Sequence, residues 1–358
     1  MTTTGLDEIA KRANVSPSTV SRVINNRVNV SIKTRERVLT AMRELDVGLA
    51  SKGLVALIIP DGTNPFFTSL GFVFQEIFDK VGLQVVTASS EGRADRELAL
   101  VNKFKGLGLR GLIYISAGQP SPTILQAVAS DNVPVVVFDR HVEGVNLDYV
   151  AVNNKSGIQG AVDYLVSLGH SRIGHLKGLA GARNAADRVA SFEEALATNQ
   201  LDVNPDWLWE GNYRFGSGRE CAERLLAFDP QERPSAVFCA NDAMAIGLIQ
   251  RLKQEGWVIP RDLSVIGFDG IDAGDWIYPR LTTIEQPVHS LAWEATQCLM
   301  ERIRGLELDP RYTATPKFRE IQPLLIPRES VGPPPARFTT RVDDMPVRLR
   351  AITGGSES

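Results

Sequence analysis

The sequence predicts an α/β protein in which a small N-terminal helical module precedes two doubly wound parallel sheets. Residues 4–46 carry three short apolar stripes at helical spacing, whereas from Leu54 onward β-rich apolar runs alternate with helical stretches. Continuous apolar strands separated by helices indicate parallel sheets that are covered on both faces. Two such series in succession predict two lobes with a cleft between them.

The N-terminal module is predicted to be a three-helix domain with a helix-turn-helix. Its first helix has apolar residues at i, i+3, i+4 and i+7, namely Leu6, Ile9, Ala10 and Ala13. Asn14 tolerates the left-handed conformation that ends a helix, and Ser16 with Pro17 caps and starts the next one. A third stripe follows a cap at Ser31 and comprises Val38, Ala41, Met42 and Leu45. The second helix of such a module enters the major groove of DNA.

The polar face of the second helix carries the candidate DNA contacts. Arg22 is the best candidate for a base-edge contact, because a guanidinium binds guanine O6 and N7 together. The neighbouring hydroxyl and amide side chains suit phosphate contacts that fix register. The predicted DNA-binding residues are Ser16, Pro17, Ser18, Thr19, Ser21, Arg22, Asn25, Asn26 and Arg27. Capping chemistry alone does not exclude the alternative of a small helical cap.

Composition agrees with an intracellular regulatory protein. Residues 1–52 carry nine Lys or Arg against five Asp or Glu, whereas the remainder carries 30 against 37. A basic headpiece on an acidic body concentrates attraction for phosphate at one end. No bilayer-length apolar run and no signal-peptide core are found, so we expect a cytoplasmic protein. Cys221, Cys239 and Cys298 are predicted to be free, buried thiols, because they are odd in number and lie in apolar contexts.

Several sequence blocks carry a family resemblance. The order D-x-I-A-x-x-A-x-V-S-x-x-T-V-S-R-V-I-N, from Asp7 to Asn25, resembles the headpiece of the lactose-repressor (LacI) family. Later blocks resemble that family's effector domain in the same order: LVALIIPDGTNPFF, PVVVFDR, LGHSRIGHL, FCANDAMAIG, SVIGFDG, PRLTTIEQP and IPRES. The resemblance implies a DNA-binding transcriptional regulator, in particular a repressor, that a small molecule controls allosterically.

The resemblance also implies a periplasmic-binding-protein-like core, in which the chain crosses between lobes three times. The expected crossings are Asn153–Ser156, Thr283–Gln286 and Tyr312–Pro316. The expected domains are a headpiece (1–46), a linker (47–53), a core (54–330) and a C-terminal tail (331–358). Within the core, lobe 1 takes about 54–154 and 285–312, and lobe 2 takes about 155–284 and 313–330, including Lys317–Ile326.

The linker, Asp46 to Gly53, departs from the family, whose members carry a hinge helix that wedges a leucine into the minor groove. At no more than ~3.5 Å per residue, these residues span a gap but do not hold a full helix with its flanks. Leu49 is the one apolar candidate for a wedge. We expect the headpieces to read major-groove half-sites through a shorter, stiffer tether. The tail contains Pro333–Pro335 and no apolar heptad that would form a tetramerising coil.

Ligands of open α/β sheets bind beyond the carboxyl ends of the strands, where this sequence places polar and aromatic residues. A hydroxyl-rich ligand needs paired donors and acceptors, and apolar surfaces against its rings. By resemblance, Arg188 and Asp269 are the strongest candidates in a set that suits a sugar or sugar derivative. The predicted effector-binding residues are Asn64, Phe66, Arg140, Arg188, Tyr213, Asn241 and Asp269. Two family positions differ here, because Asn153 stands where Asp is common and Gly270 where a polar residue is common.

Some of these residues have simpler interpretations. Asn241 is equally suited to capping the next helix, and Arg140 to a surface ion pair. Three phenylalanines fit the lobe core or a subunit interface better than a pocket wall: Phe67, Phe72 and Phe74. The resemblance implies that His170 and His175 belong to a structural turn, so they are assigned no chemistry.

Three other classes of protein are considered. A transporter's solute-binding protein would need an export signal and no headpiece. An enzyme would need a nucleophile with its base, a metal cluster or a phosphate loop, and none of these motifs is found. A family member whose short linker has cost it operator binding would be a small-molecule sensor. The leading expectation is a homodimer that binds double-stranded operator DNA and needs no cofactor or metal. Whether the effector releases DNA or promotes binding stays open.

Overall fold

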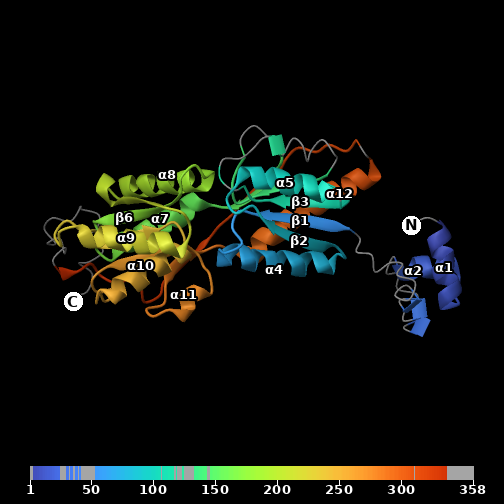
Figure 1. Ribbon diagram of the computed structural model, residues 1–358, viewed down its shortest axis with the longest axis horizontal. Helices are drawn as coiled ribbons and strands as arrows, with labels where there is room; N and C mark the ends of the chain where they lie inside the picture. Colours follow the sequence, from blue (N-terminus) through green and yellow to red (C-terminus); the bar gives the residue numbers. More distant parts are fainter. Residues whose placement is uncertain are drawn as a thin grey trace, which may run out of the picture.

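The computed structural model describes residues 3–24, 30–31, 33–34, 37–38, 40–41, 53–105, 107–116, 118, 123–124, 133–142, 146–309 and 311–336. Within these residues the chain forms a helical headpiece and two six-stranded sheets (Figure 1). Several predictions concern residues outside these ranges: those for Met42, Leu45, Asn25, Asn26, Arg27, the linker at 47–52 with Leu49, and the tail at 337–358.

The headpiece contains the predicted helix-turn-helix, formed by α1 (Thr3–Ala13) and α2 (Pro17–Ile24). Asn14 takes a φ of 50°, which turns the chain between the two helices. The Ser16 hydroxyl then accepts the amide of Thr19 at 3.2 Å and caps α2. Helical residues also follow Ser31, whose hydroxyl accepts the amide of Thr34 at 3.2 Å. The three stretches share one buried apolar cluster: Ile9, Ala10, Ala13, Val20, Val23, Val38 and Ala41.

The first sheet is parallel throughout and has the strand order β11-β5-β4-β3-β1-β2. Its strands are β1 (Leu54–Ile59), β2 (Gln84–Ser89), β3 (Leu109–Tyr114), β4 (Val135–Phe138), β5 (Asp148–Val152) and β11 (Phe318–Ile321). Because β1, β3 and β4 are nearly continuous apolar runs, both faces need cover. Helices α4 (Pro65–Lys80) and α12 (Val288–Leu308) cover one face, and α5 (Ala94–Lys105) covers the other.

The second sheet has the order β12-β10-β9-β8-β6-β7 and is parallel except for the β10–β12 pair. Its strands are β6 (Ile173–Leu179), β7 (Leu208–Gly211), β8 (Ala236–Cys239), β9 (Ser264–Asp269), β10 (Thr282–Glu285) and β12 (Leu324–Ile326). One face is covered by α7 (Asn154–Ser167) and α8 (Arg183–Thr198), the other by α9 (Phe215–Ala227) and α10 (Asp242–Gln254). Two short helices, η1 (Pro205–Trp207) and α11 (Ala273–Trp276), complete this lobe.

The segment Lys317–Ile326 corrects one prediction, because it is shared between the lobes instead of belonging to lobe 2. Strand β11 pairs with β5 in the first sheet, whereas β12 pairs with β10 in the second. The third crossing therefore lies at 322–323, not at Tyr312–Pro316. Buried Asp148 explains the placement of β11, because its carboxylate accepts both the Arg302 guanidinium (Nε, 2.8 Å) and the Lys317 amide (2.8 Å).

The beginning of the tail packs on the second lobe. Val331 is buried, and Gly332 receives a hydrogen bond from the His170 ring while its amide donates to Ser264. Burial lowers the pKa of His170 to about 4, so this ring is neutral and structural, as is His175 with its pKa of about 4. The three cysteines are free and buried, which confirms their prediction. Among the described helices, none is both long and apolar enough to span a membrane.

Candidate functional site

Helix α2 presents a polar face away from the headpiece core. Val20 and Val23 are buried beneath it, whereas Pro17, Ser18 and Arg22 are exposed. Ser16 bonds to the Ser18 and Thr19 hydroxyls at 2.9 and 2.8 Å, so its oxygen is occupied with capping. Of the candidate contacts within the described residues, Pro17, Ser18 and Arg22 therefore lie on the exposed surface of α2.

Arg37, which is not among the predicted DNA-binding residues, holds this face in place. Its guanidinium donates from Nε and Nη2 to the Ala13 carbonyl and from Nη2 to the Asn14 carbonyl, at 3.2, 2.5 and 2.7 Å. These carbonyls are the unpaired acceptors at the end of α1. Arg37 thus fixes the turn between α1 and α2 from the third helical stretch.

The cleft between the lobes contains a cavity of about 280 Å³ at the carboxyl ends of the strands. Three predicted effector residues line it together: Asn64, Arg140 and Tyr213. Phe67 belongs to the buried core of the lobe, as expected, and also lines the cavity. Phe66 is buried and is not among the residues that line the cavity. The Asn64 side chain accepts the amide of Phe66 at 3.0 Å and caps α4.

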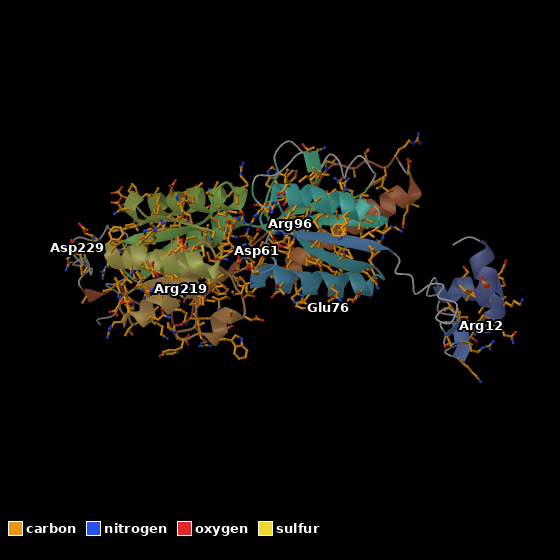
Figure 2. All side chains as sticks on the ribbon, viewed as in Figure 1. Arg12, Asp61, Glu76, Arg96, Arg219 and Asp229 are labelled. Atoms are coloured by element: carbon orange, nitrogen blue, oxygen red, sulfur yellow. The ribbon has the colours of Figure 1, made fainter. Side chains whose placement is uncertain are left out.

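Two polar links close the lobes on each other. The Arg214 guanidinium donates to Asp61 at 2.9 Å, and Figure 2 shows Asp61 where the lobes meet. The Asn184 amide donates to Asp139 at 3.2 Å and its oxygen accepts the Tyr213 hydroxyl at 3.1 Å. None of Asp61, Asp139, Asn184 and Arg214 was among the predicted effector residues. Their only signal in the sequence is that they follow strands closely, in a loop or, for Asn184, in the first turn of the next helix.

Hydrogen bonds set the charge of Asp61. Burial works to raise the pKa of this carboxyl, but hydrogen bonds from Thr63 and Arg214 outweigh it and hold the pKa below its usual value. The carboxylate therefore stays charged and able to pair with Arg214 at neutral pH. This pair is one of the polar links across the cleft.

Arg140 lies inside the protein, so its alternative interpretation as a surface ion-pair partner is wrong. Its side chain and that of Asp139 are both 4% exposed, with Arg140 Nε 3.7 Å from an Asp139 oxygen. Arg140 also donates to the Ser116 carbonyl at 2.7 Å. Within the described residues, Arg140 Nε and Asp139 Oδ1 are buried without a hydrogen bond. A buried donor and acceptor left in this state beside a cavity suit a polar ligand.

Arg188 lies deeper than the cavity and does not line it. The guanidinium stacks 3.8 Å above the Phe268 ring, and it donates to the Asn154 side chain (2.9 Å) and the Ala240 carbonyl (2.5 Å). Its side chain is essentially buried, at 2% exposure. The structure therefore gives Arg188 a role in the packing of lobe 2, and its ligand contact stays a prediction.

Asp269 and Asn241 are buried, like Arg188, and are not among the residues that line the cavity. Burial raises the pKa of Asp269 well above its usual range, although the charge of Arg188 acts in the opposite direction. Gln286 donates its side-chain amide to Asp269 at 2.8 Å. Asn241 caps α10 by accepting the Met244 amide at 3.0 Å and also donates to the Tyr213 carbonyl at 3.0 Å. The capping interpretation of Asn241 therefore holds, and the same side chain supports the cavity wall.

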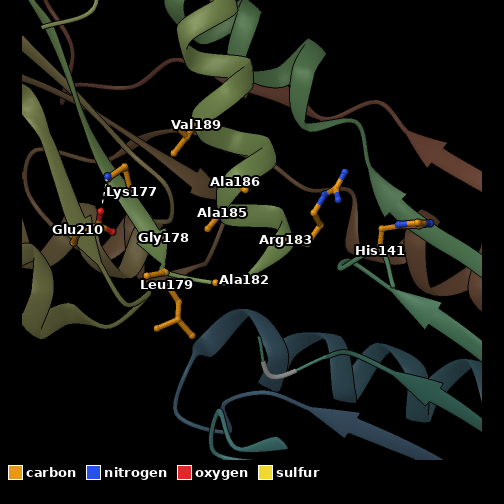
Figure 3. A pocket seen from close by; sticks show the side chains of 12 residues that line it. His141, Lys177, Gly178, Leu179, Ala182, Arg183, Ala185, Ala186, Val189 and Glu210 are labelled. Carbon is orange, nitrogen blue, oxygen red and sulfur yellow. Dashed lines mark hydrogen bonds and ion pairs between the residues drawn. The ribbon is translucent and has the colours of Figure 1, made fainter. Parts of the chain in front are cut away.

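A second cavity of about 450 Å³ adjoins the first, and Leu179 lines both. Figure 3 shows it between His141 of the first lobe and the start of α8. Ala185, Ala186 and Val189 give it an apolar wall, and an ion pair between Lys177 and Glu210 lies at one end. Among the described residues, no group of three or more His, Cys, Asp or Glu is arranged to hold a metal ion.

Comparison with known proteins agrees with this architecture. Residues 5–46 match the model for bacterial regulatory proteins of the lacI family, and residues 162–331 match a periplasmic binding protein-like domain. Catabolite control protein A of Priestia megaterium is 31% identical over 326 residues, covering 88% of this chain and 97% of that protein. The chain belongs to the LacI family of bacterial regulatory proteins.

Other transcriptional regulators align along nearly the whole chain. The transcriptional repressor PurR of Aliivibrio fischeri is 28% identical over 335 residues, covering 91% of this chain and 98% of that protein. The structure of the transcriptional regulator CelR in complex with cellobiose has a TM-score of 0.70 and 27% identity, covering 91% of this chain and 99% of the other. The fold predicted from the sequence is thus confirmed. The protein is a LacI-family transcriptional regulator.

Proposed function

We propose that the protein reads operator DNA through α2 and is controlled by a sugar-like molecule bound between its lobes. The observation that carries this proposal is the joint placement of Asn64, Arg140 and Tyr213 around one interlobe cavity. Their amide, guanidinium and phenol groups offer both donors and acceptors to hydroxyl groups. Cellobiose in the related CelR complex supports a carbohydrate as the class of ligand. A DNA-binding regulator of this kind acts in the cytoplasm.

Allosteric control of DNA binding follows from thermodynamic linkage between ligand binding and lobe arrangement. A ligand in the cavity touches both lobes, so it stabilises one lobe arrangement over the other. It competes with or adds to the links through Asp61–Arg214 and Asn184–Asp139. A change of lobe arrangement alters the spacing of two headpieces, and operator affinity changes with it.

The second headpiece comes from a second copy of the chain. Large apolar side chains are exposed on α4, on α12 and around α11: Phe72 (68%), Trp293 (53%), Trp276 (86%) and Tyr278 (78%). Figure 1 places α4 and α11 on the same side of the two sheets. We assign these exposed apolar side chains to the interface between two copies of the chain. A twofold dimer through this face sets two α2 helices against two half-sites about one helical turn apart or a multiple of it.

Operator binding is tested by selecting binding sequences from random duplexes with the purified protein. The selected sequence is then titrated in gel shifts with the wild type, with Arg22→Ala and with Glu8→Ala, which removes an exposed charge from α1. We expect Arg22→Ala to weaken specific binding by roughly 5- to 150-fold, the range for one bidentate base contact. Glu8→Ala is expected to bind like the wild type. Equal affinity of Arg22→Ala and the wild type would contradict the proposed contact.

Effector binding is tested by thermal shift against sugars, sugar acids, polyols and nucleosides. The same panel is run on Asn64→Ala, and a compound that stabilises only the wild type is then added to the gel shift. A compound that stabilises both proteins equally binds elsewhere. A carbohydrate that binds in the cleft without changing operator affinity would refute the coupling.

A further inference from the structure

The second cavity lies mainly in lobe 2, where the first turns of α8 face the end of β6 (Figure 3). Its volume of about 450 Å³ falls within the range of roughly 300–1,000 Å³ that is usual for small-molecule sites. The three effector contacts of the proposed function, Asn64, Arg140 and Tyr213, line the first cavity and not this one. The proposed function therefore leaves the larger of the two cavities without an assigned occupant.

The wall that α8 gives to the second cavity is apolar and formed by small side chains. Ala182, Ala185, Ala186 and Val189 are spaced at i, i+3, i+4 and i+7, so they share one face of the helix. Leu179, at the end of β6, adds to the apolar lining. Because an alanine side chain ends at Cβ, the volume that longer side chains would fill is left open. An apolar group of a ligand gains free energy when it moves from water onto such a wall.

The ionisable side chains of the second cavity lie at its two ends. Figure 3 shows Lys177 and Glu210 at one end, and Arg183 and His141 at the other. Lys177 Nζ donates to Glu210 at 2.5 Å, and Arg183 Nε donates to Asp187 at 2.9 Å. The charges of Lys177 and Arg183 are thus paired within the protein. A neutral group suits this cavity, because burying an unpaired charge there would be costly.

The first and second cavities are neighbours along the same segments of the chain. Arg140 lines the first and the next residue, His141, lines the second, whereas Leu179 lines both. Gly178 of the second cavity lies directly against the Tyr213 ring of the first, and a Cβ at Gly178 would clash with the Tyr213 hydroxyl. A molecule that fills the first cavity therefore ends beside the second.

We propose that the effector is a glycoside whose sugar occupies the first cavity and whose neutral aryl or alkyl substituent occupies the second. The inference rests on the proposed function for the sugar and adds the chemical class of the rest of the ligand. The first cavity offers hydrogen bonds, since Arg140 Nε is buried and has no hydrogen-bond partner among the described residues. The second offers apolar contact. A free sugar leaves the wall of α8 in contact with water, whereas the substituent covers it.

Matched glycosides measure what the substituent contributes. The methyl and phenyl β-glycosides of glucose, galactose, mannose and xylose are titrated into the full chain by calorimetry. Burying an aromatic group of this size is worth roughly 10- to 150-fold in affinity, so the phenyl glycoside of the recognised sugar is expected to bind tighter than its methyl glycoside by that factor. Equal affinities overturn the proposal. So does tighter binding of a glucosyl than of a phenyl substituent, because it would assign the second cavity to a polar group.

Two variants of α8 locate the gain in affinity. Ala186 is exposed and lines the second cavity, whereas Ala190, one turn further along α8, is also exposed and lines neither cavity. The phenylalanine of Ala186→Phe fills the second cavity, so this variant is expected to abolish the difference between phenyl and methyl glycosides. Ala190→Phe adds the same side chain to the same helix and is expected to keep the difference. A difference that persists in Ala186→Phe contradicts the assignment.

Benzyl alcohol tests the second cavity without a sugar. Methyl NMR signals of Ala185, Ala186 and Val189 in the ligand-free full chain are expected to shift when this probe is added, while that of Ala190 stays in place. In Ala186→Phe the shifts of Ala185 and Val189 are expected to disappear. If benzyl alcohol shifts none of these signals in the wild type, the apolar site is refuted.

This inference and the proposed function fail in distinguishable ways. If Asn64→Ala weakens the methyl and phenyl glycosides and the wild type binds both equally, the sugar site stands and the apolar site fails. If no glycoside binds and benzyl alcohol shifts the α8 signals, the sugar assignment of the proposed function fails and the apolar site stands.

Discussion

Replacing Arg188 with alanine is expected to destabilise the second lobe, in addition to any effect on ligand binding. The buried guanidinium makes hydrogen bonds to Asn154 and Ala240 and stacks on Phe268. Hydrogen bonds from a charged donor contribute about 1.5–3 kcal/mol each, and removing one member of a buried polar group costs about 3–5 kcal/mol in total. We take about 4 kcal/mol as the loss, which lowers the melting temperature by about 8–16 °C in a domain of this size.

Calorimetry on the wild type, Arg188→Ala and Arg183→Ala measures this difference. Arg183 lies on the same helix, is 44% exposed and pairs with Asp187 four residues on. Such a surface pair contributes about 0.3–0.5 kcal/mol, so Arg183→Ala is expected to melt within about 2 °C of the wild type. Arg188→Ala melting as high as Arg183→Ala would refute the structural role. If Arg188→Ala loses its response to a ligand, this is evidence of contact between Arg188 and the ligand only under conditions in which lobe 2 of the variant stays folded.

Three further outcomes are expected. Arg37→Ala removes the hydrogen bonds to the Ala13 and Asn14 carbonyls, and we expect it to lower the stability of the headpiece by about 1–3 kcal/mol. The loss is measured as faster amide exchange in α1, whereas Glu8→Ala is expected to leave the exchange rates in α1 unchanged. Because the pKa of Asp61 is lowered, its ion pair with Arg214 is present at pH values above 3.8, the ordinary pKa of this carboxyl, and is lost as the pH falls further. Small-angle scattering is expected to show the lobes opening as the pair is lost. Asp61→Asn lacks the pair at every pH, so it is expected to start open and to change less. Trp276→Asp is expected to give monomers in sedimentation, and a dimer that persists would place the interface elsewhere.

Local chemistry made the headpiece predictable. The left-handed turn at Asn14 and the cap at Ser16 follow from side-chain preferences, and the structure has both. The alternation of apolar strands with helices likewise predicted two parallel sheets. The placement of Phe318–Ile321 was not predictable in this way, because a short, exposed strand fits the edge of either sheet. Its partner is chosen by buried Asp148, far away in the sequence.

The sequence predicted which loops form the candidate site, but not which side chains reach the cavity and which are buried behind it. The loops that follow strands identified Asn64, Arg140 and Tyr213 correctly as neighbours. Phe67 lines the cavity and Phe66 does not, because of the way the first turn of α4 faces. The sequence places two phenylalanines side by side and does not show which of them faces the cavity. The burial of Arg188 depends on contacts to Asn154 and Ala240, which are distant in sequence. Side-chain packing of this kind is decided by tertiary structure.

The crossing at residues 322–323 limits how the two lobes can move. Strands β11 and β12 belong to different sheets and are separated by only Gln322 and Pro323. So short a connection holds the lobes together at the edge formed by β11 and β12. The lobes are therefore expected to rotate relative to each other about this edge and not to slide past each other. Spin labels on Phe318 and Leu324 should therefore keep a constant separation, while labels at the far rim, on Glu91 and Asn212, should report the full amplitude of the swing.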